Sequence, residues 1–172
     1  MNKLVTITKF FLRNFYESLT SNVKSGGQKA LTIVAMGFIL IMLAVPITLF
    51  VTVSYGVLDH FNQSELILGT LFNGASTIIF LFGIAGVMSI FYFNNDIEWI
   101  LPLPIKASHI VIGKFLTLLV YEYIILSVII PALIAYGVLS GSGIFYYITA
   151  LIVYITIPVI PIAYGVILSF IL

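Results

Sequence analysis

Four long runs of apolar residues, separated by short polar stretches, constrain the fold of this 172-residue chain more than any other feature. The first run, from Ala30 to Val53, contains no charged residue over 24 positions. A helix of that length, rising about 1.5 Å per residue, is long enough to cross a hydrocarbon core of roughly 30 Å. We therefore predict transmembrane helices over residues 30–53, 66–93, 109–138 and 144–172.

The composition of the chain supports the same interpretation. Hydrophobic residues make up 62% of the sequence and charged residues only 8%, which is more apolar surface than a soluble core of this length can hide. The predicted fold class is an all-α, polytopic helical membrane protein. The chain contains no cysteine, which excludes disulfides and cysteine-ligated metals within it. The sequence has no basic face accompanied by aromatic residues, the pattern that would indicate nucleic-acid binding.

Residues 2–24 have the pattern of an amphipathic helix lying at the membrane surface. Charged side chains follow one another at intervals of four residues in Lys9, Arg13 and Glu17. The opposite face is apolar and consists of Leu4, Ile7, Phe11, Phe15 and Leu19. We expect this face to lie in the acyl boundary and the basic side chains to contact anionic headgroups, so that membrane lipids are its partners.

The distribution of basic residues predicts the orientation of the chain. Five of the seven Lys and Arg residues lie before position 30, and none lies in the polar stretches 54–65 and 140–143. Cytoplasmic segments of membrane proteins are enriched in Lys and Arg. We therefore predict a multi-pass protein of the cell membrane whose N-terminus and segment 94–108 are cytoplasmic.

Segment 94–108, between the second and third spans, carries the densest local pattern. Asp96 and the asparagines before it can cap a short helix, which Pro102 then ends after about six residues. Pro102 and Pro104 impose a stiff, extended step without amide hydrogens. Ser108 is the predicted N-cap of the helix that follows.

The run DIEWILPLPIKASHIVIGKF, Asp96 to Phe115, resembles the cytoplasmic segment of bacterial ATP-binding-cassette type 2 exporter permeases. In that family an acidic and hydrophobic start, a Leu-Pro step and a helix opening with Gly-Lys recur. The resemblance implies a membrane subunit that works with a separate ATPase subunit. It also implies that five residues of this segment couple the permease to the ATPase, namely Asp96, Glu98, Trp99, Pro102 and Pro104.

Permeases of that family have six or more spans, so the resemblance implies that this chain is an N-terminal portion of one. A second permease half or a second copy of the chain is then a further partner. ATP itself is not expected to bind here, because Gly113 and Lys114 are followed by Phe115 and no phosphate-binding loop is present. We predict no catalytic residue, cofactor or metal site, and hence no enzyme activity in this chain.

Two polar residues within the predicted spans are candidate functional residues, Glu122 and Asn73. Glu122 lies roughly 20 Å into its span, where an ionised side chain costs on the order of 2.5 to 3.5 kcal/mol. It must face another helix or water, or be protonated. We expect Asn73 to be a buried amide. Two alternatives to the permease stay open: a secondary transporter or channel component that uses Glu122, and a membrane assembly factor that transports nothing.

Other residues in the spans predict local geometry. Pro46 predicts a kink in the first span, Pro131 a bend in the third, and Pro158 a break near Ile157 in the fourth. Lys114, about five residues inside the third span, is expected to extend its side chain to the cytoplasmic headgroups.

Overall fold

A computed structural model describes residues 3–19, 26–91 and 106–171 of the chain. Within these ranges the regular elements are all helices. Four helical segments are long and apolar enough to cross a membrane, Gly26–Phe61, Glu65–Ile90, Ala107–Leu139 and Ile144–Ile167. The predicted all-α, polytopic membrane fold is therefore confirmed.

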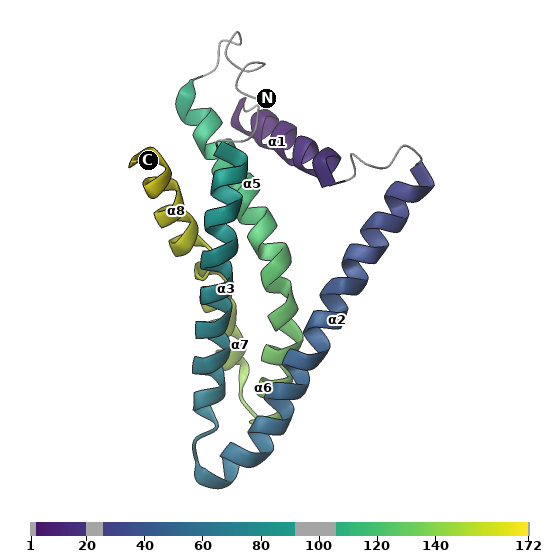
Figure 1. Ribbon diagram of the computed structural model, residues 1–172. Coiled ribbons are helices and arrows are strands. Elements are labelled where there is room, and N and C mark those ends of the chain that lie inside the picture. The colour runs from purple at the N-terminus through teal and green to yellow at the C-terminus, as the bar shows by residue number, and fades with distance from the viewer. Residues whose placement is uncertain (1–2, 20–25, 92–105, 172) are drawn as a thin grey trace.

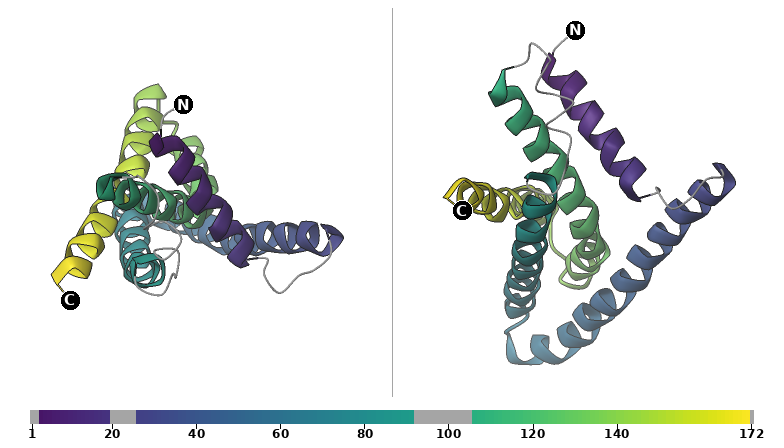
Figure 2. Two further views of the ribbon diagram at one scale, coloured as in Figure 1. Left: turned by 90° about the horizontal axis from the view of Figure 1, so that it is seen from above. Right: turned by 45° about the horizontal axis from the view of Figure 1, so that its top comes forward.

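The N-terminal helix α1 (Lys3–Leu19) lies beside the beginning of α5 (Ala107–Leu126), as both views in Figure 2 show. Its apolar side chains Ile7 and Phe11 are buried and pack with Ile110 of α5. The predicted amphipathic helix is present, but this part of its apolar face contacts protein instead of lipid.

The first span is one continuous helix, α2 (Gly26–Leu58), and Pro46 lies within it without ending it. A 3₁₀ turn, η1 (Asp59–Phe61), follows, and Asn62 adopts the left-handed conformation with φ 54°. Asparagine tolerates this conformation better than most residues do. The chain then reverses into α3 (Glu65–Phe91), and Figure 1 shows that α2 and α3 meet at this turn and diverge away from it.

The third span is interrupted where Pro131 predicts a bend. Helix α5 is followed by a 3₁₀ turn, η2 (Ser127–Ile129), and then by α6 (Ile130–Leu139) with Pro131 in its first turn. Proline has no amide hydrogen to continue the α-helical pattern, and it is favoured at the beginning of a helix. The α-helix is therefore interrupted next to the position of the predicted bend.

The fourth span is likewise divided into α7 (Ile144–Thr156) and α8 (Val159–Ile171). The break falls at Ile157 and Pro158, as predicted. The end of α7 is fixed to α5 by two tyrosines, because the Tyr123 hydroxyl donates a hydrogen bond of 2.6 Å to the Ile155 carbonyl and the Tyr154 hydroxyl donates one of 3.2 Å to the Tyr123 carbonyl.

Two clusters of buried side chains form the core. The larger cluster joins α2, α3, α5 and α6 and includes Val51, Ile67, Leu126, Ala132 and Tyr136. The second joins α3, α5 and α8 through Val87, Ile90, Leu118 and Ile162. As Figure 1 shows, the beginnings of α2 and α5 and the end of α3 lie at the end of the bundle near α1, opposite η1.

The beginning of the third span differs from the prediction. Helix α5 begins at Ala107, and Lys106, not Ser108, occupies its N-cap position. Lys106 has an extended backbone (φ −69°, ψ 136°) and makes no side-chain capping bond. Ser108 is already inside the first turn, so the prediction of its capping role was wrong.

Candidate functional site

The five residues implied to couple the chain to an ATPase, Asp96, Glu98, Trp99, Pro102 and Pro104, lie outside the described residues, as does the predicted short helix. The described residues on either side of them are the end of α3 and the beginning of α5. These two helix ends and α1 lie at the same end of the bundle (Figure 1).

Gly113 lies at the contact between α1 and α5. A Cβ atom on Gly113 would lie 3.0 Å from the Ile7 side chain and 3.2 Å from the Phe11 ring. These separations are shorter than ordinary van der Waals contact, so a side chain at this position would require Ile7 and Phe11 to shift. The Gly-Lys pair that contributes to the family resemblance thus begins with a residue that fixes α1 to α5.

Lys114 was expected to extend its side chain to the headgroups, but its contacts are with protein. Its side chain is buried, and its Nζ donates a hydrogen bond of 2.7 Å to the carbonyl of Ile90 in the last turn of α3. Carbonyls in a last turn lack a partner within the helix and attract cations. Nζ also lies 5.7 Å from the centre of the Phe11 ring, within the range of a cation–π contact. Lys114 therefore joins α1, α3 and α5.

Glu122 is fully buried, as the sequence argument required. Both carboxyl oxygens lack a hydrogen-bond partner among the described residues. Its Oε1 faces α3 and lies 3.7 Å from where a Cβ atom on Gly83 would be. The side chain of Tyr121 lies close enough to interact electrostatically with the Glu122 carboxyl, and the residue of α3 that faces the carboxyl is Gly83.

Glycines bring three helices together around Glu122. A Cβ on Gly83 would also lie 3.8 Å from Ile162 of α8, and a Cβ on Gly165 of α8 would lie 3.1 Å from Val87 of α3. Leu118, one turn before Glu122, fills the space beside Gly86, where a Cβ would lie 2.5 Å from its side chain. The carboxyl therefore lies in a tight, apolar junction of α3, α5 and α8.

Asn73 does not have the buried position that we expected. Its side chain is exposed on α3, and no hydrogen bond of its amide is seen among the described residues. Gly69 and Gly74 beside it have no neighbour within 4 Å of an added Cβ. Asn73 and Glu122 do not form a common site, because Gly83, not Asn73, faces the carboxyl.

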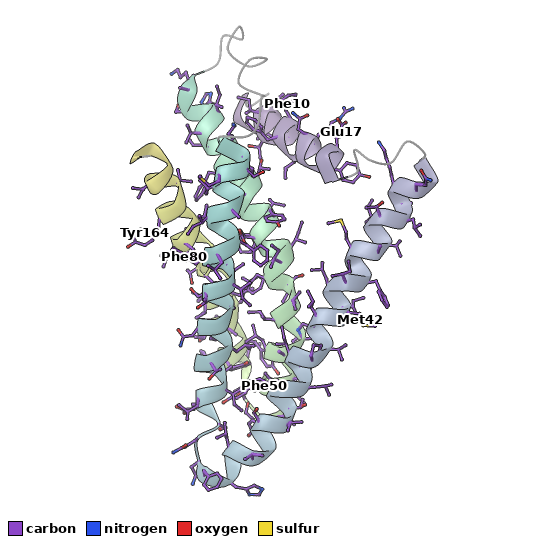
Figure 3. All side chains as sticks on the ribbon, viewed as in Figure 1. Phe10, Glu17, Met42, Phe50, Phe80 and Tyr164 are labelled. Carbon is purple, nitrogen blue, oxygen red and sulfur yellow. The ribbon has the colours of Figure 1, made fainter. Side chains whose placement is uncertain are left out.

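An apolar groove of about 510 Å³ lies between α2 and the helices α3 and α5. Its walls include Leu43 and Ile47 of α2, Ile78 and Phe82 of α3, and Ile125 of α5. Beyond the groove, α2 exposes apolar side chains on several sides, among them Met42 and Phe50 (Figure 3). A second, smaller hollow of about 180 Å³ lies between α3 and α5 and is lined in part by Ser89 and Tyr121.

No group of three or more His, Asp or Glu side chains among the described residues is arranged to hold a metal ion. Comparisons of the chain with models of protein families, with curated proteins and with solved structures found no match.

The sequence analysis did not predict the contacts of Lys114 or the hydrogen bonds of the tyrosines between α5 and α7. The Gly113-Lys114 pair was the only feature of the sequence that pointed to the contacts of Lys114.

Proposed function

We propose that this chain is a membrane-spanning permease subunit, or an N-terminal part of one, of an ATP-driven exporter of the bacterial cell membrane. ATP hydrolysis takes place in a separate ATPase subunit that contacts segment 94–108. The proposal starts from the resemblance of Asp96–Phe115 to exporter permeases. It is supported by the way in which the described residues hold the two ends of that segment.

The observation that carries the proposal is the junction at Gly113 and Lys114. Through these two residues α5 contacts both α1 and the last turn of α3. A force applied to the segment before α5 therefore acts on three helices together. Pro102 and Pro104 favour an extended, stiff connection, so a displacement of the preceding short helix is passed to α5 instead of being absorbed.

The apolar groove between α2 and the rest of the bundle gives further support. A groove of about 510 Å³ with almost entirely apolar walls is suited to hydrocarbon groups that enter from the bilayer.

Two double variants test the proposal in the complete transporter. Replacing Glu98 and Trp99 by alanine should release the ATPase subunit, because these side chains form the proposed contact. Replacing Pro102 and Pro104 by glycine should retain the ATPase but uncouple ATP hydrolysis from transport, since it removes only stiffness. The measurements are ATPase retention during purification from native membranes, ATPase activity stimulated by substrate, and transport.

The matched control is the pair Phe61 and Glu65, an exposed aromatic and an acidic residue at the opposite end of the bundle. Alanine at both positions should leave ATPase retention unchanged. An ATPase held as tightly by the Glu98 and Trp99 variant as by the parent would contradict the proposed contact, and normal transport by the glycine variant would contradict the proposed coupling.

A second candidate function is a secondary transporter or channel component that uses Glu122. The observation in its favour is the buried carboxyl without a hydrogen-bond partner among the described residues. Intramembrane carboxyls commonly mark ion and proton pathways. This candidate predicts transport driven by an ion gradient in vesicles that contain no ATPase, whereas the exporter permease predicts none.

A further inference from the structure

The junction of α3, α5 and α8 holds a carboxyl that has no ionic or hydrogen-bond role in the described arrangement. Glu122 has no exposed surface, and neither of its oxygens has a hydrogen-bond partner among the described residues. Its carboxyl faces Gly83, where an added Cβ atom would lie in van der Waals contact, 3.7 Å from Oε1 and 3.8 Å from the Ile162 side chain. An ionised carboxylate is strongly disfavoured in such surroundings, while the neutral acid is tolerated.

Among the other titratable groups on the described parts of these three helices, Tyr121 is close enough to Glu122 for an electrostatic interaction, but no hydrogen bond joins the two side chains. On the described part of α3 the titratable residue is Glu65, at the far end, and on α8 it is Tyr164, which is exposed. On α5, Lys114 lies two turns away, roughly 12 Å along the helix, and Tyr123 bonds α7. His109 lies in the first turn of α5, and Tyr121 lines the smaller hollow.

Helix α8 is the element of the junction that directly follows a break in the chain. The chain is held by Tyr123 and Tyr154 just before the break at Pro158, and α8 begins beyond that break. Pro158 lacks an amide hydrogen, so the helical hydrogen bonding of α7 does not continue unbroken into α8. Helix α8 contacts the others around Glu122 through Ile162 and Gly165.

We propose that Glu122 binds and releases a proton, and that loss of the proton moves α8 away from α3 and α5 about the break at Pro158. When the carboxyl is neutral, the three helices pack as described. When it releases its proton to water, the carboxylate requires hydration, and the closed junction has no room for it. The smaller hollow, of about 180 Å³, is lined by Tyr121, the residue before Glu122, and offers space for that water.

This inference does not depend on an ATPase partner and is tested on the chain alone. The chain contains no cysteine, so pairs of cysteines can be introduced for spin labels. Phe80 on α3 and Tyr164 on α8 are suitable because their side chains are 40% and 60% exposed and lie on the outside of the two helices (Figure 3). Val57 on α2 and Val138 on α6 form a control pair, because they are exposed and lie on helices outside the junction.

The distance between the labels is measured in lipid nanodiscs at pH 5 and at pH 9. In the parent, the distance between positions 80 and 164 should increase by several ångströms at the higher pH, and the control distance should not change. Glu122→Gln cannot ionise and should keep the short distance at both pH values. Glu122→Met gives the same test should the glutamine variant fail to fold.

Two results would overturn the proposal. One is a distance between positions 80 and 164 that is the same at both pH values in the parent. The other is a pH-dependent increase of equal size in Glu122→Gln or Glu122→Met, because the movement would then have another cause. A failure of the ATPase experiments described above would leave this inference unaffected.

Discussion

Gly137 shows how closely single residues determine the packing at the η1 end of the bundle. A Cβ on Gly137 would lie 2.7 Å from the Tyr146 ring and 2.8 Å from the Tyr147 hydroxyl. Tyr146 is itself fixed, because its hydroxyl donates a hydrogen bond of 2.9 Å to the Leu133 carbonyl and its ring packs against Tyr136. The turn from α6 to α7 therefore depends on the missing side chain of Gly137.

Gly137→Ala should destabilise the protein by about 1–3 kcal/mol, because the added methyl group displaces two tyrosine rings. Gly74→Ala on α3 is the control, since nothing lies within 4 Å of its added Cβ. It should be neutral or stabilising by up to about 1 kcal/mol, because alanine favours helix more than glycine does. Thermal unfolding in detergent measures both, and equal unfolding temperatures for the two variants would refute the role of Gly137.

Glu122→Met should raise the thermal stability of the purified chain. Methionine has a similar length and removes two buried oxygens that lack partners, each of which costs about 1–3 kcal/mol when left unsatisfied. The measurement is the unfolding temperature at pH 7. A lower unfolding temperature than that of the parent would mean that the carboxyl makes a stabilising contact.

At the scale of residues, sequence reasoning reached the burial of Glu122 but not the glycine that faces it. Hydropathy and helix rise place a residue in depth, and the cost of a charge at that depth then requires shielding. They do not give the rotation of one helix relative to another. For this reason Asn73 was expected to be buried and is exposed, and Lys114 was expected at the headgroups and instead bonds Ile90.

At the scale of elements, the contact between α1 and α5 can be tested by substituting the residues that form it. It rests on Ile7 and Phe11 against a glycine. An amphipathic helix also binds a membrane surface without any protein contact. The question is therefore whether α1 is held by α5 or by lipid.

Gly113→Val should detach α1 from α5, because the branched side chain occupies the space of Ile7 and Phe11. A disulfide between cysteines at positions 7 and 110, on the two facing surfaces, reports the contact and should form several-fold more slowly in the variant. Gly69→Val, with open space around it, should leave the rate unchanged. Equal crosslinking in both variants would show that α1 does not need the glycine.

The positions of the helices were largely predictable from the sequence. The apolar runs predicted four spans, and the prolines predicted the interruptions at Pro131 and Pro158. Proline lacks an amide hydrogen, and its effect on helical hydrogen bonding is local and does not depend on how the helix packs. Pro46 had no such effect, since α2 continues past it. The predicted N-cap at Ser108 was wrong because a capping side chain does not by itself fix where a helix begins. The backbone conformation decides which residue near the start is the N-cap.

At the scale of the whole molecule, the arrangement predicts which loops face the same side of the membrane. The turn between α2 and α3, which contains the exposed Asn62, and the beginning of α5, which the exposed Lys106 precedes, lie at opposite ends of the bundle (Figure 1). Cysteine at position 62 should be labelled by an impermeant thiol reagent in intact cells, and cysteine at position 106 only after the cells are opened. Labelling of position 106 but not of position 62 in intact cells would reverse the orientation and remove the basis for an ATPase contact.

Helix α2 packs against the other helices mainly near one of its ends. Its packing against the bundle lies in its second half, at residues such as Val51 and Tyr55, whereas Leu31, Val34 and Phe38 are exposed. The half before Pro46 is about 30 Å long at roughly 1.5 Å per residue. A rotation of α2 about its attachment by about ten degrees would displace its beginning by about 5 Å. In that geometry a small rearrangement among the tyrosines at one end of the bundle would be enlarged into a lateral displacement at the other end.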